Sequence, residues 1–191
     1  LSYIIAVEEL ARVDGSTAAT IAAGNSLGIS PIKEYGTKEQ KEKYLPRLCK
    51  SHLWGFGLTE ENAGCDSRGT QSTARLEGDK WIVNGSKIFI TNSATPMTLG
   101  STIQVITGEN NGKPEFTTFL IENDTEGFSQ EPMHRKMMWR ASNTGKLTFN
   151  NVELPKENML GKPGQGSHIM LATLDGGRLS IAAMGLGCAQ G

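Results

Sequence analysis

The hydrophobic period of the chain changes at Trp54 and changes again after Asn158. Before Trp54, apolar residues recur at helical spacing, as in Leu1–Val13, and the same spacing returns over Ile169–Gln190. Between these two points, short runs rich in β-branched and aromatic residues alternate with turn residues. The pattern therefore predicts an α+β chain in which a sheet stands between two helical regions.

Residues 1 to about 52 are predicted to be helical. A second helix is expected over Ser16–Ala23, with Ser16 as its cap, because Ser side chains accept hydrogen bonds from the first turn of a helix. The polar, glycine-bearing stretch Asn25–Ser30 is expected to interrupt it.

The spacing of Thr37 and Gln40 is that of a capping box, in which each residue bonds the backbone of the other. It predicts a helix from Lys38 to about Cys49. Pro46 lies inside this span and is expected to kink the helix or end it early, since proline removes a backbone donor.

Five β-strands are predicted after Trp54: Thr70–Leu76, Trp81–Thr91, Thr102–Thr107, Phe116–Glu122 and Gly145–Val152. Turns are expected at Glu77–Lys80, Asn84–Gly85 and Asn110–Pro114. Because no helical pattern separates the strands, an antiparallel barrel or sandwich is favoured over a parallel sheet. No G-x-G-x-x-G follows a strand, so a nicotinamide dinucleotide site is not expected.

The charge and cysteine patterns exclude several classes of function. The formal net charge is −1 and no basic block occurs, so nucleic acid is not an expected partner. No run is expected to span a bilayer. The histidines and cysteines stand far apart, which predicts no metal site and favours a reducing compartment. These residues are His52, His134, His168, Cys49, Cys65 and Cys188.

One stretch, Phe56–Ser67, begins as an apolar strand and continues as a loop rich in glycine and Asx residues. Such a loop can present backbone N–H groups and hydroxyls to a polar ligand. An ordinary strand end is the alternative interpretation of this stretch alone.

Together with Trp81–Asn92, this stretch resembles the paired flavin-binding segments of the acyl-CoA dehydrogenases, "F-A-L-T-E-P-x-A-G-S-D" and "W-x-x-N-G-x-K-x-W-I-T-N". Five further segments resemble motifs of that family in the same order: Glu8–Arg12, Tyr35–Lys41, Arg140–Thr144, Val152–Gly161 and Leu174–Arg178. The resemblance covers essentially the whole chain.

The resemblance implies a three-part fold. Residues 1–53 would be the end of an N-terminal helical domain, 54–158 a middle β-barrel domain that binds flavin and acyl-CoA, and 159–191 the start of a C-terminal helical domain. Both helical domains are expected to be truncated, so the chain is expected to be an excerpt of a longer protein.

The resemblance also implies a function. The family removes a proton from the carbon α to a thioester and passes a hydride from the β carbon to N5 of FAD, which gives a trans-2-enoyl-CoA. A short-chain, butyryl-type acyl-CoA is the expected substrate, an electron-transferring flavoprotein the expected electron acceptor and a homotetramer the expected assembly. The expected location is a bacterial or archaeal cytoplasm or the mitochondrial matrix.

By the same resemblance, Phe56, Leu58 and Thr59 border the isoalloxazine, with the Thr59 hydroxyl at its polar edge. Thr91 would bond near N5, and Phe89 would pack on the ring in place of the family's usual Trp. The expected cofactor-binding set also includes Gly64, Cys65 and Ile90.

Substrate contacts are implied for Cys65, Asp175 and Arg178. Cys65 stands where the family usually has a Ser that contacts the CoA portion, and a small buried residue filling a gap is the alternative. Asp175 and Arg178 can share one helical face, where a solvated salt bridge is the alternative. Gly177 occupies a position at which isovaleryl-type members carry the catalytic Glu, so the general base is expected beyond Gly191, and no catalytic residue is named in this chain.

Two alternatives stay open at this point. A flavin oxidase of the same superfamily would share the flavin segments. A non-catalytic acyl-CoA or flavin-binding homologue is suggested by Cys65 and by Met138, which stands where the family commonly has Gly.

Overall fold

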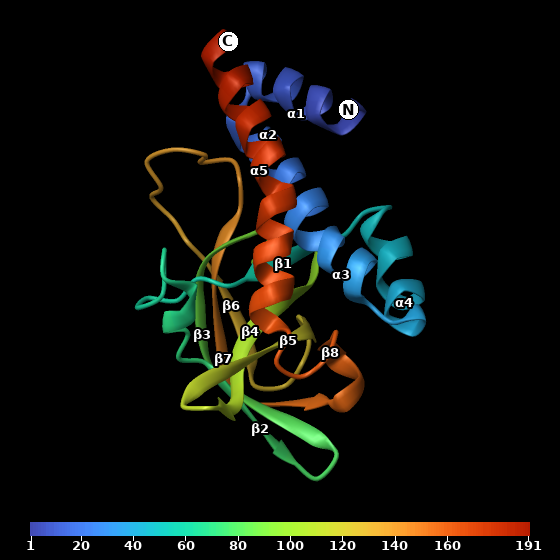
Figure 1. The fold of residues 1–191 in the computed structure, drawn as a ribbon. Coiled ribbons are helices and arrows are strands. Elements are labelled where there is room, and N and C mark those ends of the chain that lie inside the picture. Colours follow the sequence, from blue (N-terminus) through green and yellow to red (C-terminus); the bar gives the residue numbers. More distant parts are fainter.

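The computed structural model describes residues 1–191 as a layer of helices packed against an eight-stranded sheet (Figure 1). The long helix α5 runs along the helical layer beside α1 and α2, and both chain ends lie at the same end of the molecule (Figure 1). The helices are α1 (Ser2–Val13), α2 (Gly15–Ala23), the π-helix η1 (Gly24–Ile29), α3 (Ser30–Tyr35), α4 (Lys38–Leu48) and α5 (Gly166–Gln190).

The sheet is mixed and open. Its strands are β1 (Leu53–Gly57), β2 (Thr73–Glu77), β3 (Lys80–Thr91), β4 (Thr98–Asn110), β5 (Lys113–Glu122), β6 (Phe128–Pro132), β7 (Thr144–Pro155) and β8 (Met159–Leu160). The order along the sheet is β6-β7-β3-β2-β4-β5-β8, and β1 pairs with β4 off this path. Two short 3₁₀ turns, η2 (Ser67–Gly69) and η3 (Lys156–Asn158), interrupt the β region.

The expected antiparallel barrel is therefore not confirmed. β1 and β2 both run parallel to β4, and β6 and β8 do not pair to close the sheet. A parallel neighbour needs a long connection, and here the connection from β1 to β4 contains β2 and β3, while that from β2 to β4 contains β3. Hydrophobic alternation shows which face of a strand is buried but not in which direction the strand runs. The sequence pattern therefore does not distinguish a parallel neighbour from an antiparallel one.

Several local expectations were right in type and wrong in detail. The capping box of Thr37 and Gln40 is present, and α4 starts at Lys38 as expected. Pro46 does not end α4, which continues to Leu48. The cap of α2 is Asp14 rather than Ser16, because the Asp14 carboxylate accepts hydrogen bonds from the first turn.

The stretch Asn25–Ser30 was expected to interrupt the helix, and this was wrong, since the helix continues through it as η1. Gly28 does not break the helix there but allows close contact with β1. A Cβ added at Gly28 would lie 2.7 Å from the Trp54 carbonyl oxygen. The polar side chains are satisfied inside the helix, with Asn25 donating to Ile21 O and Ser26 donating to Ala22 O.

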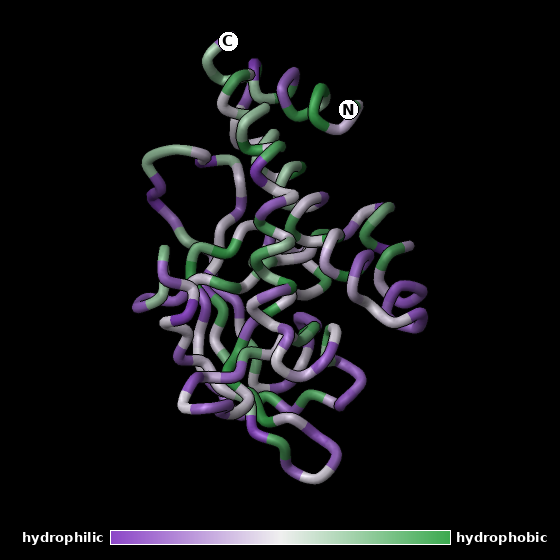
Figure 2. Tube along the Cα trace, viewed as in Figure 1, coloured by the Kyte–Doolittle hydropathy of each residue, from purple (hydrophilic) through white to green (hydrophobic).

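Asn84 and Gly85 were expected to form a turn, but both lie inside β3. Gly85 has φ +134°, a conformation that favours glycine, and a Cβ there would lie 2.3 Å from Ser72 Oγ. Glycine is therefore required at this position because the strand is irregular and Ser72 packs against it. The turn expected at Glu77–Lys80 is present, and its polar tip projects from the end of the sheet far from the helices (Figure 2).

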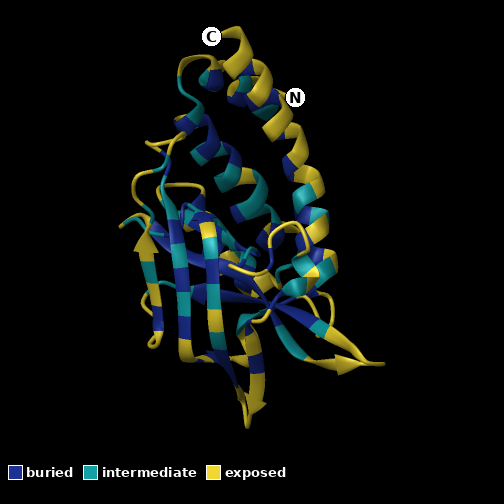
Figure 3. Ribbon diagram, turned by 90° about the vertical axis from the view of Figure 1, so that its left-hand side faces the viewer, coloured by how far each residue is buried: buried dark blue, intermediate teal, exposed yellow.

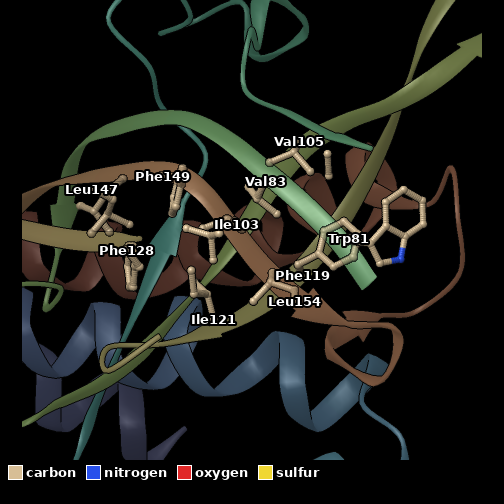
Figure 4. Close-up of a cluster of buried hydrophobic side chains, with 13 residues drawn as sticks. Trp81, Val83, Ile103, Val105, Phe119, Ile121, Phe128, Leu147, Phe149 and Leu154 are labelled. Carbon is tan, nitrogen blue, oxygen red and sulfur yellow. The ribbon is translucent and has the colours of Figure 1, made fainter. Parts of the chain in front are cut away.

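The main core fills the interior of the sheet and consists of 13 buried side chains from six strands (Figure 4). Trp81 and Phe119 meet edge to face in it, and Phe128 stacks on Phe149. A second cluster joins α3, α4 and α5 to the sheet around the fully buried Trp54, whose Nε1 donates to Thr102 Oγ1 at 2.8 Å. The helical layer is thereby fixed on β1, and this places α2, η1 and α5 beside the C-terminal ends of β1 and β3.

Helix α5 is long and apolar enough, by length and composition, to cross a membrane, which departs from the expectation that no such run exists. Its buried side packs on α1, α2 and η1, while its other side is exposed (Figure 3). A core helix of a soluble protein passes the same length and composition test, so this helix is weak evidence for a membrane span.

Candidate functional site

A β-bulge in β3 turns Phe89 out of the strand. Lys87 pairs with Leu147 and Ile90 with Gly145, so that two residues of β3 stand opposite one residue of β7. Phe89 has φ +62°, a conformation that costs free energy for a bulky residue and is held only where the surroundings enforce it. Its ring is 61% exposed at the end of the sheet that faces α2 and η1.

Next to Phe89 lies a cavity of about 250 Å³, here named the strand-end cavity. It is formed by the end of β1 and the loop after it, by the end of β3, and by side chains from the helical layer. Seven of the eight residues expected to contact the flavin line it: Phe56, Leu58, Thr59, Gly64, Phe89, Ile90 and Thr91. The others are Ala23, Leu27, Trp54 and Leu174.

The cavity has few polar side chains, and several donors along it have no partner within the chain. The hydroxyls of Thr59 and Thr91 make no hydrogen bond, and the backbone N–H groups of Thr59 and Gly64 donate to no backbone acceptor. A cavity with apolar walls and a few convergent donors suits a planar heterocycle that has one polar edge. These residues therefore fit an isoalloxazine ring.

Cys65 does not line the strand-end cavity and is exposed, so the expectation of a small buried residue filling a gap is wrong. Its thiol is free, as are the other two thiols of the chain. At this position the side chain can meet a ligand that approaches from solvent.

A buried ion pair lies beneath the loop that carries Thr59. Lys87 Nζ donates to Glu60 Oε1 at 2.6 Å, and the side chains are 0% and 7% exposed. The Glu60 carboxylate also accepts hydrogen bonds from the backbone N–H groups of Gln71 and Ser72. Burial raises the pKa of the Glu60 carboxyl, but the charge of Lys87 and these hydrogen bonds outweigh it, so this pKa lies below its usual value.

This ion pair joins the two sequence segments that meet at the cavity. Glu60 follows Thr59 in the loop after β1, and Lys87 precedes the bulge that carries Phe89. Between them, the Ile88 N–H donates to the Thr59 carbonyl oxygen at 2.9 Å. The ion pair and this backbone bond together hold the loop on the strand, and so fix Thr59 relative to Phe89.

A second cavity of about 350 Å³, here named the helical cavity, borders the first. Ala23, Leu27, Thr91 and Leu174 line both cavities. The helical cavity continues between α2 and α5 and is otherwise lined by Ala19, Ser26, Trp139, Gly177, Arg178 and Ile181. The two cavities are therefore neighbours, with Thr91 at their junction.

Arg178 lines the helical cavity, whereas Asp175 does not. The two side chains form an i, i+3 ion pair at 2.9 Å with both groups largely exposed, which is the solvated salt bridge considered above. Gly177 is buried against Leu27, where a Cβ would lie 3.2 Å from Leu27 Cδ2. No carboxylate lines either cavity, so the described residues assign no general base.

Three residues of the site were missed from the sequence. Glu60 and Lys87 belong to the two motifs, but the motifs do not show that they pair; a lysine inside a predicted buried strand is a signal of a paired buried charge. Trp139 lies in an irregular loop, where no hydrophobic period marks it as part of a cavity wall.

Comparisons with known proteins agree with this arrangement. The family model described as acyl-CoA dehydrogenase, N-terminal domain, matches residues 1–52, and the one described as acyl-CoA dehydrogenase, middle domain, matches residues 55–152. The chain is 48% identical to the short-chain specific acyl-CoA dehydrogenase of Clostridium acetobutylicum, over 100% of the chain and 50% of that protein.

Solved structures give the same result. Butyryl-CoA dehydrogenase from Megasphaera elsdenii matches with a TM-score of 0.91 and 44% identity, over 97% of this chain and 49% of that one. A glutaryl-CoA dehydrogenase from Mycobacterium smegmatis in complex with FADH2 matches with a TM-score of 0.90 and 34% identity, over 99% of this chain and 47% of that one. The chain spans about half the length of the curated relatives it matches.

Proposed function

The chain belongs to the acyl-CoA dehydrogenase family, and we propose that the whole protein is an FAD-dependent dehydrogenase of a short-chain acyl-CoA. The observation that carries this proposal is that the strand-end and helical cavities are neighbours and share four lining residues, Thr91 among them. The strand-end cavity fits a flavin ring, and the helical cavity is a largely apolar space that borders it at Thr91. A flavin and an acyl chain must be adjacent for this reaction, and the two cavities offer adjacent volumes of suitable chemistry.

In this proposal the strand-end cavity holds the isoalloxazine of FAD. Thr59 and Thr91 donate or accept at its polar edge, and Phe89 covers part of one face. Phenylalanine presents less ring surface than the tryptophan usual in the family, so the aromatic contact is retained at reduced area. Bound FAD supplies the acceptor for a hydride from the β carbon of the substrate.

The chain's own residues orient the substrate. The apolar walls of the helical cavity exclude water from the acyl chain, and Arg178 at its rim offers a positive charge to the polar CoA portion. Cys65, which is exposed in the loop after β1, would contact the same portion. The proton α to the thioester requires a base, which we assign to the part of the whole protein that this chain does not span.

The proposal extends to partners and location. The reduced flavin would pass its electrons to an electron-transferring flavoprotein, and the whole protein would be a homotetramer, as is usual in the family. The location that follows from the family is a bacterial or archaeal cytoplasm or the mitochondrial matrix.

Flavin content and oxygen reactivity test the proposal together. The purified whole protein is expected to carry FAD, to be reduced by butyryl-CoA under anaerobic conditions, and to be reoxidised slowly in air but rapidly by an electron-transferring flavoprotein. Rapid reoxidation in air would instead identify an oxidase. Flavin that stays oxidised in the presence of acyl-CoA of every length would identify a non-catalytic homologue.

A further inference from the structure

The loop between β6 and β7 forms one wall of the helical cavity. It extends from the sheet to the helical layer (Figure 1). Its tip carries Met137, Met138 and Trp139, of which Trp139 alone lines the cavity, at 37% exposure. Trp139 has φ +51°, so the loop holds a bulky residue in a conformation that such residues rarely adopt.

The geometry of the helices shows which end of the cavity Trp139 closes. Gly177 of α5 lies against Leu27 of η1, and Cys188 of α5 lies at Gly15 of α2. The two helices are therefore antiparallel. The groove between them runs from the Thr91 junction toward the start of α2.

Trp139 lies at this far end. A Cβ on Gly15 would be 3.4 Å from Trp139 Nε1 and 3.2 Å from Cys188 Sγ, so the indole and the thiol both lie against Gly15. Ala19, which follows Gly15 by about one helical turn, lines the cavity together with Trp139. The indole thus stands across the end of the groove that lies away from the Thr91 junction.

Lys136 holds the loop in this shape. Its ammonium donates to the Trp139 carbonyl oxygen at 2.8 Å, to Thr144 Oγ1 at 2.9 Å and to the Ser142 carbonyl oxygen. These three bonds use all the donors of the ammonium group. The buried Ser142 also links the loop to α2 through Thr20 Oγ1 at 3.3 Å.

We propose that Trp139 is the end wall of the acyl channel and sets the longest acyl chain that the enzyme accepts, with Lys136 as the positioning residue that holds it there. This inference rests on the proposed function. A chain that fills the channel up to the indole gains nothing from a further methylene, because that methylene has no cavity to enter. The substrate class of the site is then a short acyl thioester.

The test compares the whole protein with its Trp139→Ala variant on thioesters of increasing length. Each buried methylene contributes about four-fold in affinity, so two methylenes contribute on the order of ten-fold. We expect the ratio of kcat/KM for hexanoyl-CoA over butyryl-CoA to rise on the order of ten-fold in Trp139→Ala. The dissociation constants of the matching 2-enoyl-CoA products, measured by calorimetry, are expected to change in the same direction.

Variants of the loop supply the controls. Met137 is 93% exposed and lines no cavity, so Met137→Ala should leave the ratio unchanged. Lys136→Met should raise the ratio by a smaller factor than Trp139→Ala, and Lys136→Arg should restore it. Trp139→Leu removes less volume and serves as the second variant if Trp139→Ala does not fold.

The outcomes separate this inference from the proposed function. If the native protein oxidises acyl-CoA and the Trp139 variants keep its length preference, the end-wall role is wrong and the proposed function stands. If the native protein oxidises no acyl-CoA, the proposed function fails, and the calorimetric length series still decides whether Trp139 limits binding.

Discussion

Replacing the buried Lys87 by Met should destabilise the protein more than removing any exposed charge of this chain. Methionine keeps most of the side-chain volume, so the change isolates the loss of the ammonium group. Lys87 is fully buried, and Glu60 would keep its charge with only the Gln71 and Ser72 N–H groups beside it. Removing one partner of a buried ion pair costs about 3–5 kcal/mol, because the other charge stays buried without compensation.

Thermal unfolding of the flavin-loaded whole protein, followed by flavin fluorescence, measures this effect. A loss of that size lowers Tm by about 6–20 °C for a cooperative unit of 150–250 residues. The matched control is Lys146→Met. Lys146 lies on β7, the strand next to β3, and donates to Glu61, the residue after Glu60, at 2.9 Å. Both of these side chains are exposed, and such a surface ion pair contributes about 0–1 kcal/mol.

The double variant Glu60→Gln with Lys87→Met sharpens the test. It removes both charges while the oxygen of the introduced amide side chain still accepts a backbone N–H, so it should be more stable than Lys87→Met alone. If Lys87→Met lost no more stability than Lys146→Met, the buried pair would not hold the flavin loop and the reasoning would be refuted.

The pH dependence of the same comparison follows from Glu60. Its pKa in the folded protein lies below the unfolded value, so the pair contributes stability above the unfolded pKa, about 4.3, and loses it as pH falls through the folded pKa. The stability difference between the native protein and Lys87→Met should therefore be full at neutral pH and shrink in acid. A difference that stayed constant down to the acid transition would contradict this assignment.

Three further substitutions test the flavin and substrate assignments. Thr91→Val removes one neutral hydrogen bond, about 0.5–1.5 kcal/mol, and should weaken FAD retention or shift its potential with Tm unchanged; wild-type affinity, spectrum and potential would contradict the role. Cys65→Ser should tighten acyl-CoA binding by roughly two- to ten-fold in calorimetry, and unaltered affinity would remove Cys65 from the substrate site. Phe89→Trp should bind FAD more tightly, with slower FAD dissociation, since an indole covers more of the ring; unchanged dissociation would separate Phe89 from the flavin face.

The sequence predicted those elements whose determinants are local. The capping box at Thr37 places the start of α4 by two hydrogen bonds within one turn. The change of period at Trp54 coincides closely with the start of β1. In contrast, Gly28 and Gly85 were interpreted as breakers although each permits close contact with a segment distant in sequence, at Trp54 and Ser72. A glycine's role depends on what lies opposite it, and this is absent from the local pattern.

The candidate site likewise contains residues that the sequence identifies and residues that only the fold brings into place. The two motifs identified the residues around the strand-end cavity, because their order and spacing are distinctive. The sequence did not reveal that Glu60 and Lys87 bind each other across 27 residues, since pairing depends on how the loop after β1 folds onto β3. Trp139 was missed for a related reason, because its place in the cavity depends on the bonds of Lys136 rather than on its neighbours in the chain.

The most direct test of the account is an anaerobic titration of the purified whole protein with butyryl-CoA. The absorbance of oxidised flavin and the amount of 2-enoyl-CoA are measured in the same samples. A flavin in the strand-end cavity with the acyl chain beside it at Thr91 predicts one enoyl-CoA formed for each flavin reduced. Protein that binds butyryl-CoA and FAD together, yet leaves the flavin oxidised and forms no enoyl-CoA, would contradict the account.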